Sequence, residues 1–106
     1  MVRKAYINAV SIFHRKLTVI HIETNIRGIC ELKAWQVPVS KKYPLGIKYS
    51  LFCVDFQSKE VIIGFDNHYP KGPHKHRHQT EDDYEYLSLE KLVDDFWNEL
   101  KTRGYN

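Results

Sequence analysis

The sequence predicts an α+β fold: an antiparallel β-sheet meander of about four to five strands, with a C-terminal helix packed on one face. Three observations predict it. The first two thirds of the chain carry β-rich apolar runs separated by turn residues. Two of these runs flank a short polar turn, which is typical of a hairpin. The C-terminal stretch has apolar residues at helical spacing, so it supplies a layer that covers the sheet.

Two strands are predicted in the first third of the chain. Residues 17–24 (LTVIHIET) are rich in β-branched residues, and Asn25 and Gly28 after them favour a turn. Residues 29–37 (ICELKAWQV) form the second run, which Pro38 ends. Alternation in this run sorts its side chains onto two faces: Ile29, Glu31, Lys33 and Trp35 on one, and Cys30, Leu32, Ala34 and Gln36 on the other.

The best hairpin signal follows a loop over residues 38–44. Residues 47–56 (IKYSLFCVDF) and 60–66 (EVIIGFD) are both rich in β-branched and aromatic residues, and only Gln57-Ser58-Lys59 separates them. The segment before Leu17 is ambiguous, because Tyr6, Val10 and Phe13 also fit one face of a helix. Strand or irregular structure is favoured there.

The C-terminal helix is the clearest element. Ser88 is a good N-cap, Glu90 places negative charge in the first turn, and Gly104 ends the helix. The stripe that packs on the sheet consists of Leu89, Leu92, Val93, Phe96, Trp97 and Leu100.

Size and composition predict a single cytoplasmic domain over residues 1–106, with no membrane span. Cys30 and Cys53 lie inside apolar runs and are expected to be buried free thiols. The charge is uneven: residues 1–50 hold nine Lys and Arg against two acids, whereas residues 51–106 hold seven against eleven. The basic half could meet a polyanion, although ordinary solvated surface explains it equally well.

The chemistry is expected between the last long strand and the helix, in residues 64–78 (GFDNHYPKGPHKHRH). Four of the six histidines lie here, with Lys71, Lys75 and Arg77, and no acid occurs from Asn67 to Thr80. Pro70, Gly72 and Pro73 exclude a helix and favour a shaped loop. Four acids follow at once: Glu81, Asp82, Asp83 and Glu85.

One interpretation is cleavage of RNA without a metal. A base must take the 2′-hydroxyl proton and an acid must protonate the leaving oxygen, and histidine titrates in the range that both need. His74 and His76 are the preferred acid and base, with their order left open. Lys71 is the preferred phosphate contact. In an extended chain, His74, His76 and His78 would project to one side, with Lys75 and Arg77 on the other.

Two other interpretations stay open. An H-x-H-x-H run could bind a metal with Asp66, Asp82 or Glu85, although neighbouring Lys and Arg repel a cation. A histidine-rich loop beside acids could also be a solvated surface with no chemistry.

The string Gly64-Phe65-Asp66-Asn67, followed by Lys71-Gly72-Pro73-His74-Lys75-His76, resembles the signature of the TumE family. Tyr84-Glu85-Tyr86 and residues 88–96 (SLEKLVDDF) resemble the strand and helix that follow it, and residues 49–55 resemble the strand before it. The resemblance covers about the last sixty residues.

The resemblance implies the toxin of a type II toxin–antitoxin pair, with a helix-turn-helix antitoxin as partner and RNA as target. The residues it carries over are Asp66, Asn67, Lys71, Gly72, His74 and His76. With the reading of the residues, this predicts a metal-independent ribonuclease that needs no cofactor. His74 and His76 would be catalytic with Asp66 orienting a histidine, Lys71, Lys75 and Arg77 would bind phosphate, and Asn67 and Gly72 would set loop geometry. The alternatives are a non-catalytic module that binds nucleic acid or protein, and a metal-dependent hydrolase.

Overall fold

A computed structural model describes residues 9–106 of the chain. These residues confirm the α+β class, but the sheet has six strands instead of four or five. The elements in chain order are β1 (Val10–Ile20), β2 (Arg27–Gln36), β3 (Ile47–Asp55), β4 (Val61–Asp66), β5 (His74–Arg77), β6 (Thr80–Asp83) and α2 (Leu89–Thr102).

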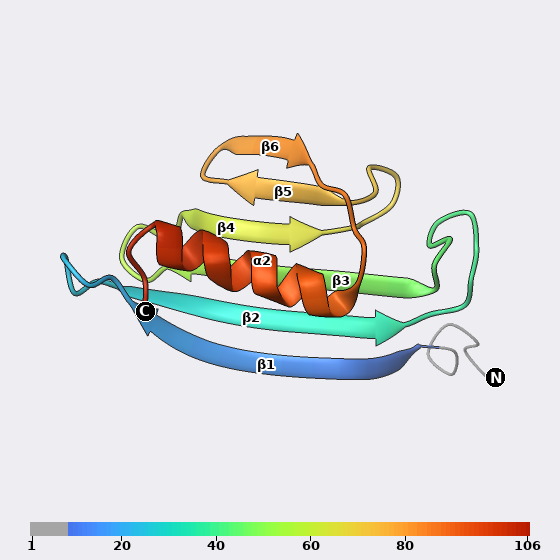
Figure 1. The fold of residues 1–106 in the computed structure, drawn as a ribbon, viewed down its shortest axis with the longest axis horizontal. Coiled ribbons are helices and arrows are strands. Elements are labelled where there is room, and N and C mark those ends of the chain that lie inside the picture. Colours follow the sequence, from blue (N-terminus) through green and yellow to red (C-terminus); the bar gives the residue numbers. More distant parts are fainter. Residues whose placement is uncertain (1–8) are drawn as a thin grey trace.

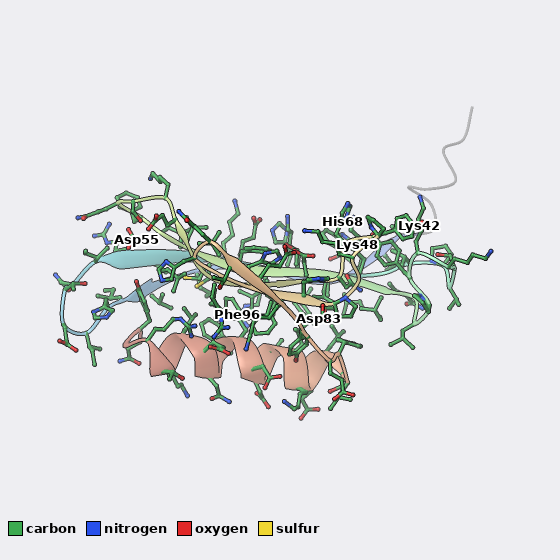
Figure 2. The ribbon with its side chains drawn as sticks, turned by 90° about the horizontal axis from the view of Figure 1, so that it is seen from above. Lys42, Lys48, Asp55, His68, Asp83 and Phe96 are labelled. Carbon is green, nitrogen blue, oxygen red and sulfur yellow. The ribbon has the colours of Figure 1, made fainter. Side chains whose placement is uncertain are left out.

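The sheet is a meander in which every strand pairs antiparallel with the next one along the chain, in the order β1-β2-β3-β4-β5-β6. Helix α2 crosses one face of this sheet (Figure 1). In the view turned by 90°, α2 lies on one side of the sheet, while Lys48 and His68 lie on the other (Figure 2). The second face, called the open face below, is covered by none of the helices or strands within residues 9–106.

The first strand differs from its prediction. It begins at Val10, seven residues before the expected start, and it ends at Ile20, where residues 21–24 turn the chain instead of continuing the strand. The polar run His14-Arg15-Lys16 obscured it, because an edge strand with one open face tolerates charged side chains. Tyr6, which also entered that prediction, lies outside the described residues.

The alternation predicted for residues 29–36 is confirmed. Cys30 pairs with Cys53 and Leu32 pairs with Leu51, and all four side chains are buried beneath α2. Both thiols are free, as expected. A hydrogen bond with Cys30, together with burial, raises the pKa of the Cys53 thiol, so this pair behaves as part of the apolar core.

Strands β5 and β6 were missed because they contain no apolar side chain. Pro70, Gly72 and Pro73 predicted a shaped loop and no fifth or sixth strand was assigned, yet His74–Arg77 adds to β4 and then pairs with Thr80–Asp83. These strands are held by backbone ladders and by ion pairs between opposed side chains, so hydrophobic periodicity gives no sign of them.

The helix matches its prediction. The Ser88 hydroxyl accepts a hydrogen bond from the backbone N–H of Lys91 at 3.1 Å, and Gly104 adopts φ +87° just past the end. Leu92, Phe96 and Leu100 are fully buried against the sheet. Within residues 9–106, no helix has the length and apolarity that crossing a bilayer requires.

Candidate functional site

The β4–β5 hairpin brings the predicted site residues onto the open face. His76 pairs with Gly64 and His74 pairs with Asp66 across the ladder. The intervening pair, Phe65 and Lys75, faces α2: the Phe65 ring lies 6.4 Å from that of Phe96 on the helix. Because successive side chains of a strand point to opposite faces, His74, His76 and Asp66 share the face away from the helix.

His76 forms a dyad with Asp66. Its Nε2 lies 2.9 Å from Oδ2 of Asp66, and the two side chains are about three-quarters buried, with 25% and 23% exposed. The other carboxylate oxygen of Asp66 accepts a hydrogen bond from the backbone N–H of His68 at 3.1 Å, which fixes the carboxylate. A neutral imidazole that donates to Asp66 through Nε2 carries its lone pair on Nδ1.

Gly64 leaves room for the Phe52 ring beside His76. The Phe52 ring centroid is 5.4 Å from that of His76, and a Cβ added to Gly64 would stand 2.2 Å from Cε1 of Phe52. Any side chain at Gly64 would therefore displace the ring. The glycine of the recognised string thus has a structural reason: the close approach of an aromatic ring to the backbone.

His74 is held by one hydrogen bond and lies beside an exposed carboxylate. Its Nδ1 lies 2.9 Å from the carbonyl oxygen of Gly72, and its Nε2 lies 3.4 Å from Oδ1 of Asp83. Nδ1 makes the hydrogen bond, while Nε2 lies at ion-pair distance from a fully exposed carboxylate.

Lys71 completes the group through Glu81. Its Nζ lies 2.9 and 3.0 Å from the two Glu81 oxygens, and this hydrogen bond lowers the pKa of the Glu81 carboxyl below its ordinary value. Glu81 also lies 4.0 Å from Nε2 of His76. A shallow pocket of about 210 Å³ opens here, lined by Asp66, His68, Tyr69, Pro70, Lys71, His76 and Glu81.

The structure does not bring Lys75 and Arg77 to this group. Nζ of Lys75 lies 2.9 Å from Oε2 of Glu99 on α2, and Arg77 is ion-paired with Asp82. Both belong to the helix side of β5 by alternation. The two faces of this short strand therefore separate the predicted cations from the histidines.

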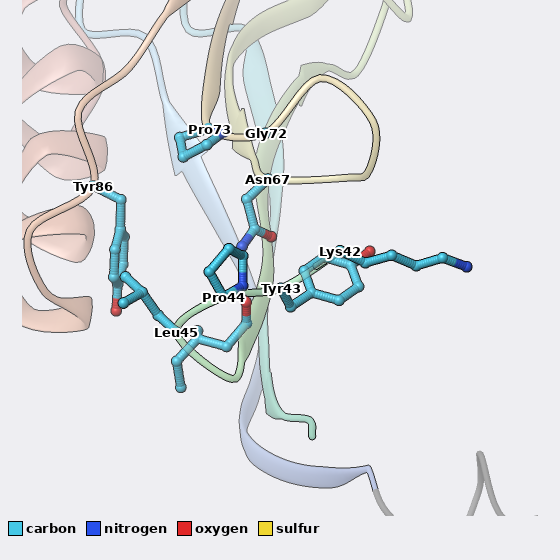
Figure 3. A pocket seen from close by; sticks show the side chains of 9 residues that line it. Lys42, Tyr43, Pro44, Leu45, Asn67, Gly72, Pro73 and Tyr86 are labelled. Carbon is cyan, nitrogen blue, oxygen red and sulfur yellow. The ribbon is translucent and has the colours of Figure 1, made fainter. Parts of the chain in front are cut away.

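Asn67 and Gly72 shape the loop between β4 and β5. The Asn67 side chain donates to the carbonyl oxygen of Ile47 at 2.8 Å and accepts from the N–H of Tyr49 at 2.9 Å, so it extends the ladder beyond the last residue of β4. Gly72 adopts φ +76°, which favours glycine. Figure 3 shows Asn67, Gly72 and Tyr86 around a second pocket, of about 200 Å³, with the Lys42 side chain directed away from it.

Three residues of the site were given no role by sequence reasoning: Phe52, Glu81 and Asp83. Phe52 could have been found, because it directly precedes Cys53 in a predicted strand and alternation places the two side chains on different faces. Glu81 and Asp83 could not, because their strand was missed. His78, in contrast, leaves the row of histidines at the β5–β6 turn, where its φ is +51°.

No group of three or more His, Cys, Asp or Glu side chains with metal-binding geometry occurs among residues 9–106. Asp66 and Glu81 are the carboxylates nearest to His76, and both already accept hydrogen bonds from the protein.

Comparison with known proteins identifies a family. The family described as Toxin TumE matches residues 3–104, nearly the whole chain, whereas the sequence resemblance had covered about the last sixty residues. Neither the curated proteins nor the solved structures gave a match. A match of this extent, with the Asp66-Asn67 and Lys71-Gly72 strings placed around one site, shows that the chain belongs to the TumE toxin family.

Proposed function

We propose that this chain is the toxin of a type II toxin–antitoxin pair and that it cleaves RNA without a metal ion. The family supports the toxin role and implies an antitoxin partner. A helix-turn-helix antitoxin and a cytoplasmic site of action belong to the proposal. The observation that carries the chemistry is the His76–Asp66 dyad, with His74 two residues away on the same face.

In this proposal the two histidines take different roles. Nδ1 of His76 takes the proton of a ribose 2′-hydroxyl while Asp66 holds the ring and stabilises the imidazolium that forms. The 2′-oxygen bonds to the adjacent phosphorus as the bond from phosphorus to the 5′-oxygen breaks. His74 gives its proton to that 5′-oxygen. The products are a 2′,3′-cyclic phosphate and a free 5′-hydroxyl.

Lys71 is the cation available to the phosphate. In the free protein it is paired with Glu81 at the surface, and its side chain is 62% exposed. An exposed ion pair is weak, so a phosphate dianion or diester can compete with Glu81 for the ammonium. Lys75 and Arg77 can assist only as more distant charges, because their ion pairs hold them on the helix side.

The test is incubation of the purified protein with RNA in excess EDTA. The variants are His76→Ala, His74→Ala and the double variant, with His78→Ala as the matched control from the same segment. We expect wild type and His78→Ala to cut RNA and leave 2′,3′-cyclic phosphate ends, and the site variants to lose about 100-fold or more in rate. A DNA strand of the same sequence, which lacks the 2′-hydroxyl, should stay intact.

Three outcomes would contradict the proposal. Cleavage that appears only with added Mg²⁺, Mn²⁺ or Zn²⁺ would indicate a metal-dependent hydrolase. RNA that stays intact under all conditions, yet binds the protein, would indicate a binding module. Equal activity in wild type and the double variant would place the chemistry elsewhere.

A further inference from the structure

A strip of aromatic and basic side chains runs along the open face toward the dyad. Its first member is Trp35 on β2, which is half-buried and pairs across the ladder with Lys48 on β3. Alternation from the buried Ala34 and Tyr49 places both on the open face. None of the elements within residues 9–106 covers them. A large aromatic ring is thus presented to solvent on a rigid sheet.

Lysines flank this ring. Nζ of Lys33 lies 5.7 Å from the Trp35 ring centroid, and Nζ of Lys48 lies 5.9 Å from it and 6.0 Å from that of Tyr43. Such cation–π contacts are worth about 0.5–1 kcal/mol at exposed sites, so an incoming ligand can displace them. A ring with two ammonium groups beside it matches one nucleotide, whose base stacks while its phosphate takes a cation.

The strip is mostly basic, and the one acid beside it on β2 is Glu31, which pairs with Phe52 and lies 3.9 Å from Nζ of Lys33. Residues 32–54 contain no Asp or Glu, and they hold four lysines: Lys33, Lys41, Lys42 and Lys48. Nζ of Lys42 lies 5.5 Å from the ring of Tyr69, so the β2–β3 loop meets the β4–β5 loop at one end of the sheet. Lys42, Lys48 and His68 gather at that end, on the side away from α2 (Figure 2).

The strip is continuous with the cleavage site. From Lys48, the open-face positions of β3 run through Ser50 to Phe52, about 13 Å at 3.3 Å per residue. Ser50 pairs with Asp66 of the dyad, and the Phe52 ring contacts His76. The path therefore begins at Trp35 and ends at Phe52, whose ring lies beside His76.

We infer that this strip binds single-stranded RNA, with bases stacked on Trp35 and Phe52 and the backbone led to His76. The inference rests on the proposed function for its cleavage step, but the binding surface itself does not. An unpaired base offers its flat face to an aromatic ring, whereas a duplex keeps its base faces stacked inside. The toxin would accordingly act on unpaired segments of RNA and spare double-stranded ones.

Tryptophan fluorescence tests the inference, because the chain has two tryptophans on opposite sides of the sheet. Trp97 lies on α2 against Phe96, with ring centroids 5.2 Å apart. Two single-tryptophan proteins, Trp97→Phe and Trp35→Phe, are made in a His74→Ala/His76→Ala background that removes cleavage. Each is titrated in EDTA with oligouridylate and with a double-stranded RNA of equal length. Far-UV circular dichroism checks that each is folded.

We expect oligouridylate to quench Trp35 in the Trp97→Phe protein and to leave Trp97 unchanged in the other. Trp35→Ala should weaken oligouridylate binding about tenfold, with little change for the duplex. Equal quenching of both tryptophans, no quenching of Trp35, or equal affinity for duplex and single strand would overturn the inference. Because binding is read in a cleavage-deficient protein, quenching of Trp35 stands even if the wild type cuts no RNA. Conversely, if wild type cuts RNA but Trp35 is not quenched, the binding surface is refuted and the proposed cleavage is not.

Discussion

The two faces of the sheet are built from the same strands and differ in almost every property. Beneath α2, the row of paired residues Leu32, Leu51 and Phe65 on β2, β3 and β4 is apolar and buried, and it continues as Lys75 and Asp82 on β5 and β6. The adjacent open-face row is entirely polar: Lys33, Ser50, Asp66, His74 and Asp83. A shift of one residue thus separates stability from chemistry, because the side-chain period of a strand is two.

The largest expected effect lies on the helix face. Phe96→Ala removes a fully buried ring that contacts Phe65 and Trp97, and it should lower the free energy of unfolding by about 3–5 kcal/mol. Urea denaturation followed by circular dichroism measures it. Phe52→Ala, a ring of equal size on the open face, is the matched comparison and should cost clearly less. Equal losses of stability in the two variants would show that the open face contributes as much to the core as the helix face.

Gly64→Ala should come next, at about 1–3 kcal/mol, because its Cβ would stand 2.2 Å from Cε1 of Phe52 and force that ring to move. It should also impair RNA cleavage, since the displaced ring no longer supports His76. Combining it with Phe52→Ala should recover most of the stability but not the activity. If the double variant loses as much stability as the two single variants together, or more, the collision with Phe52 is not the cause.

The ion pair between Lys75 on β5 and Glu99 on α2 should make the stability of the fold depend on pH. Burial alone would raise the pKa of the Glu99 carboxyl, but hydrogen bonds from Lys75 and Arg103 outweigh it and lower the pKa. A lowered pKa stabilises the fold above the ordinary carboxyl range near 4.3 and loses that stability as the pH falls through the folded value. Between pH 7 and about pH 3, the free energy of unfolding should fall by about 1 kcal/mol less in Glu99→Gln than in wild type. Denaturant titrations at the two pH values measure this difference. A parallel fall would argue against the link.

The smallest effect concerns Lys71. Glu81→Gln removes the partner that occupies its ammonium, so RNA affinity should rise a few-fold and depend more steeply on salt, by about one phosphate contact. Lys71→Ala in the same background should abolish the gain. Affinity that falls in Glu81→Gln would show that the carboxylate supports the site in some other way.

Sequence reasoning succeeded where burial of one face produces a periodic pattern of apolar residues. The alternation around Cys30 and Leu32 and the helical stripe through Phe96 are consequences of one covered face, so local sequence contains them. It failed for β5 and β6, whose stability comes from pairing with neighbours and not from apolar burial. The residue types of the site were visible in the string, but the contact of His76 with Asp66 depends on the β4–β5 register, which no short window of sequence specifies.

The meander also dictates an order of assembly. Since each strand pairs with its neighbour in the chain, the sheet can zip up through local hairpins as the polypeptide leaves the ribosome, without long loop closures. Helix α2 follows all six strands in the chain, and residues 104–106 bond back to Ile20 and Ile22 at the β1 edge. Until α2 docks, the apolar face of the sheet is exposed, so the folding chain passes through an aggregation-prone stage.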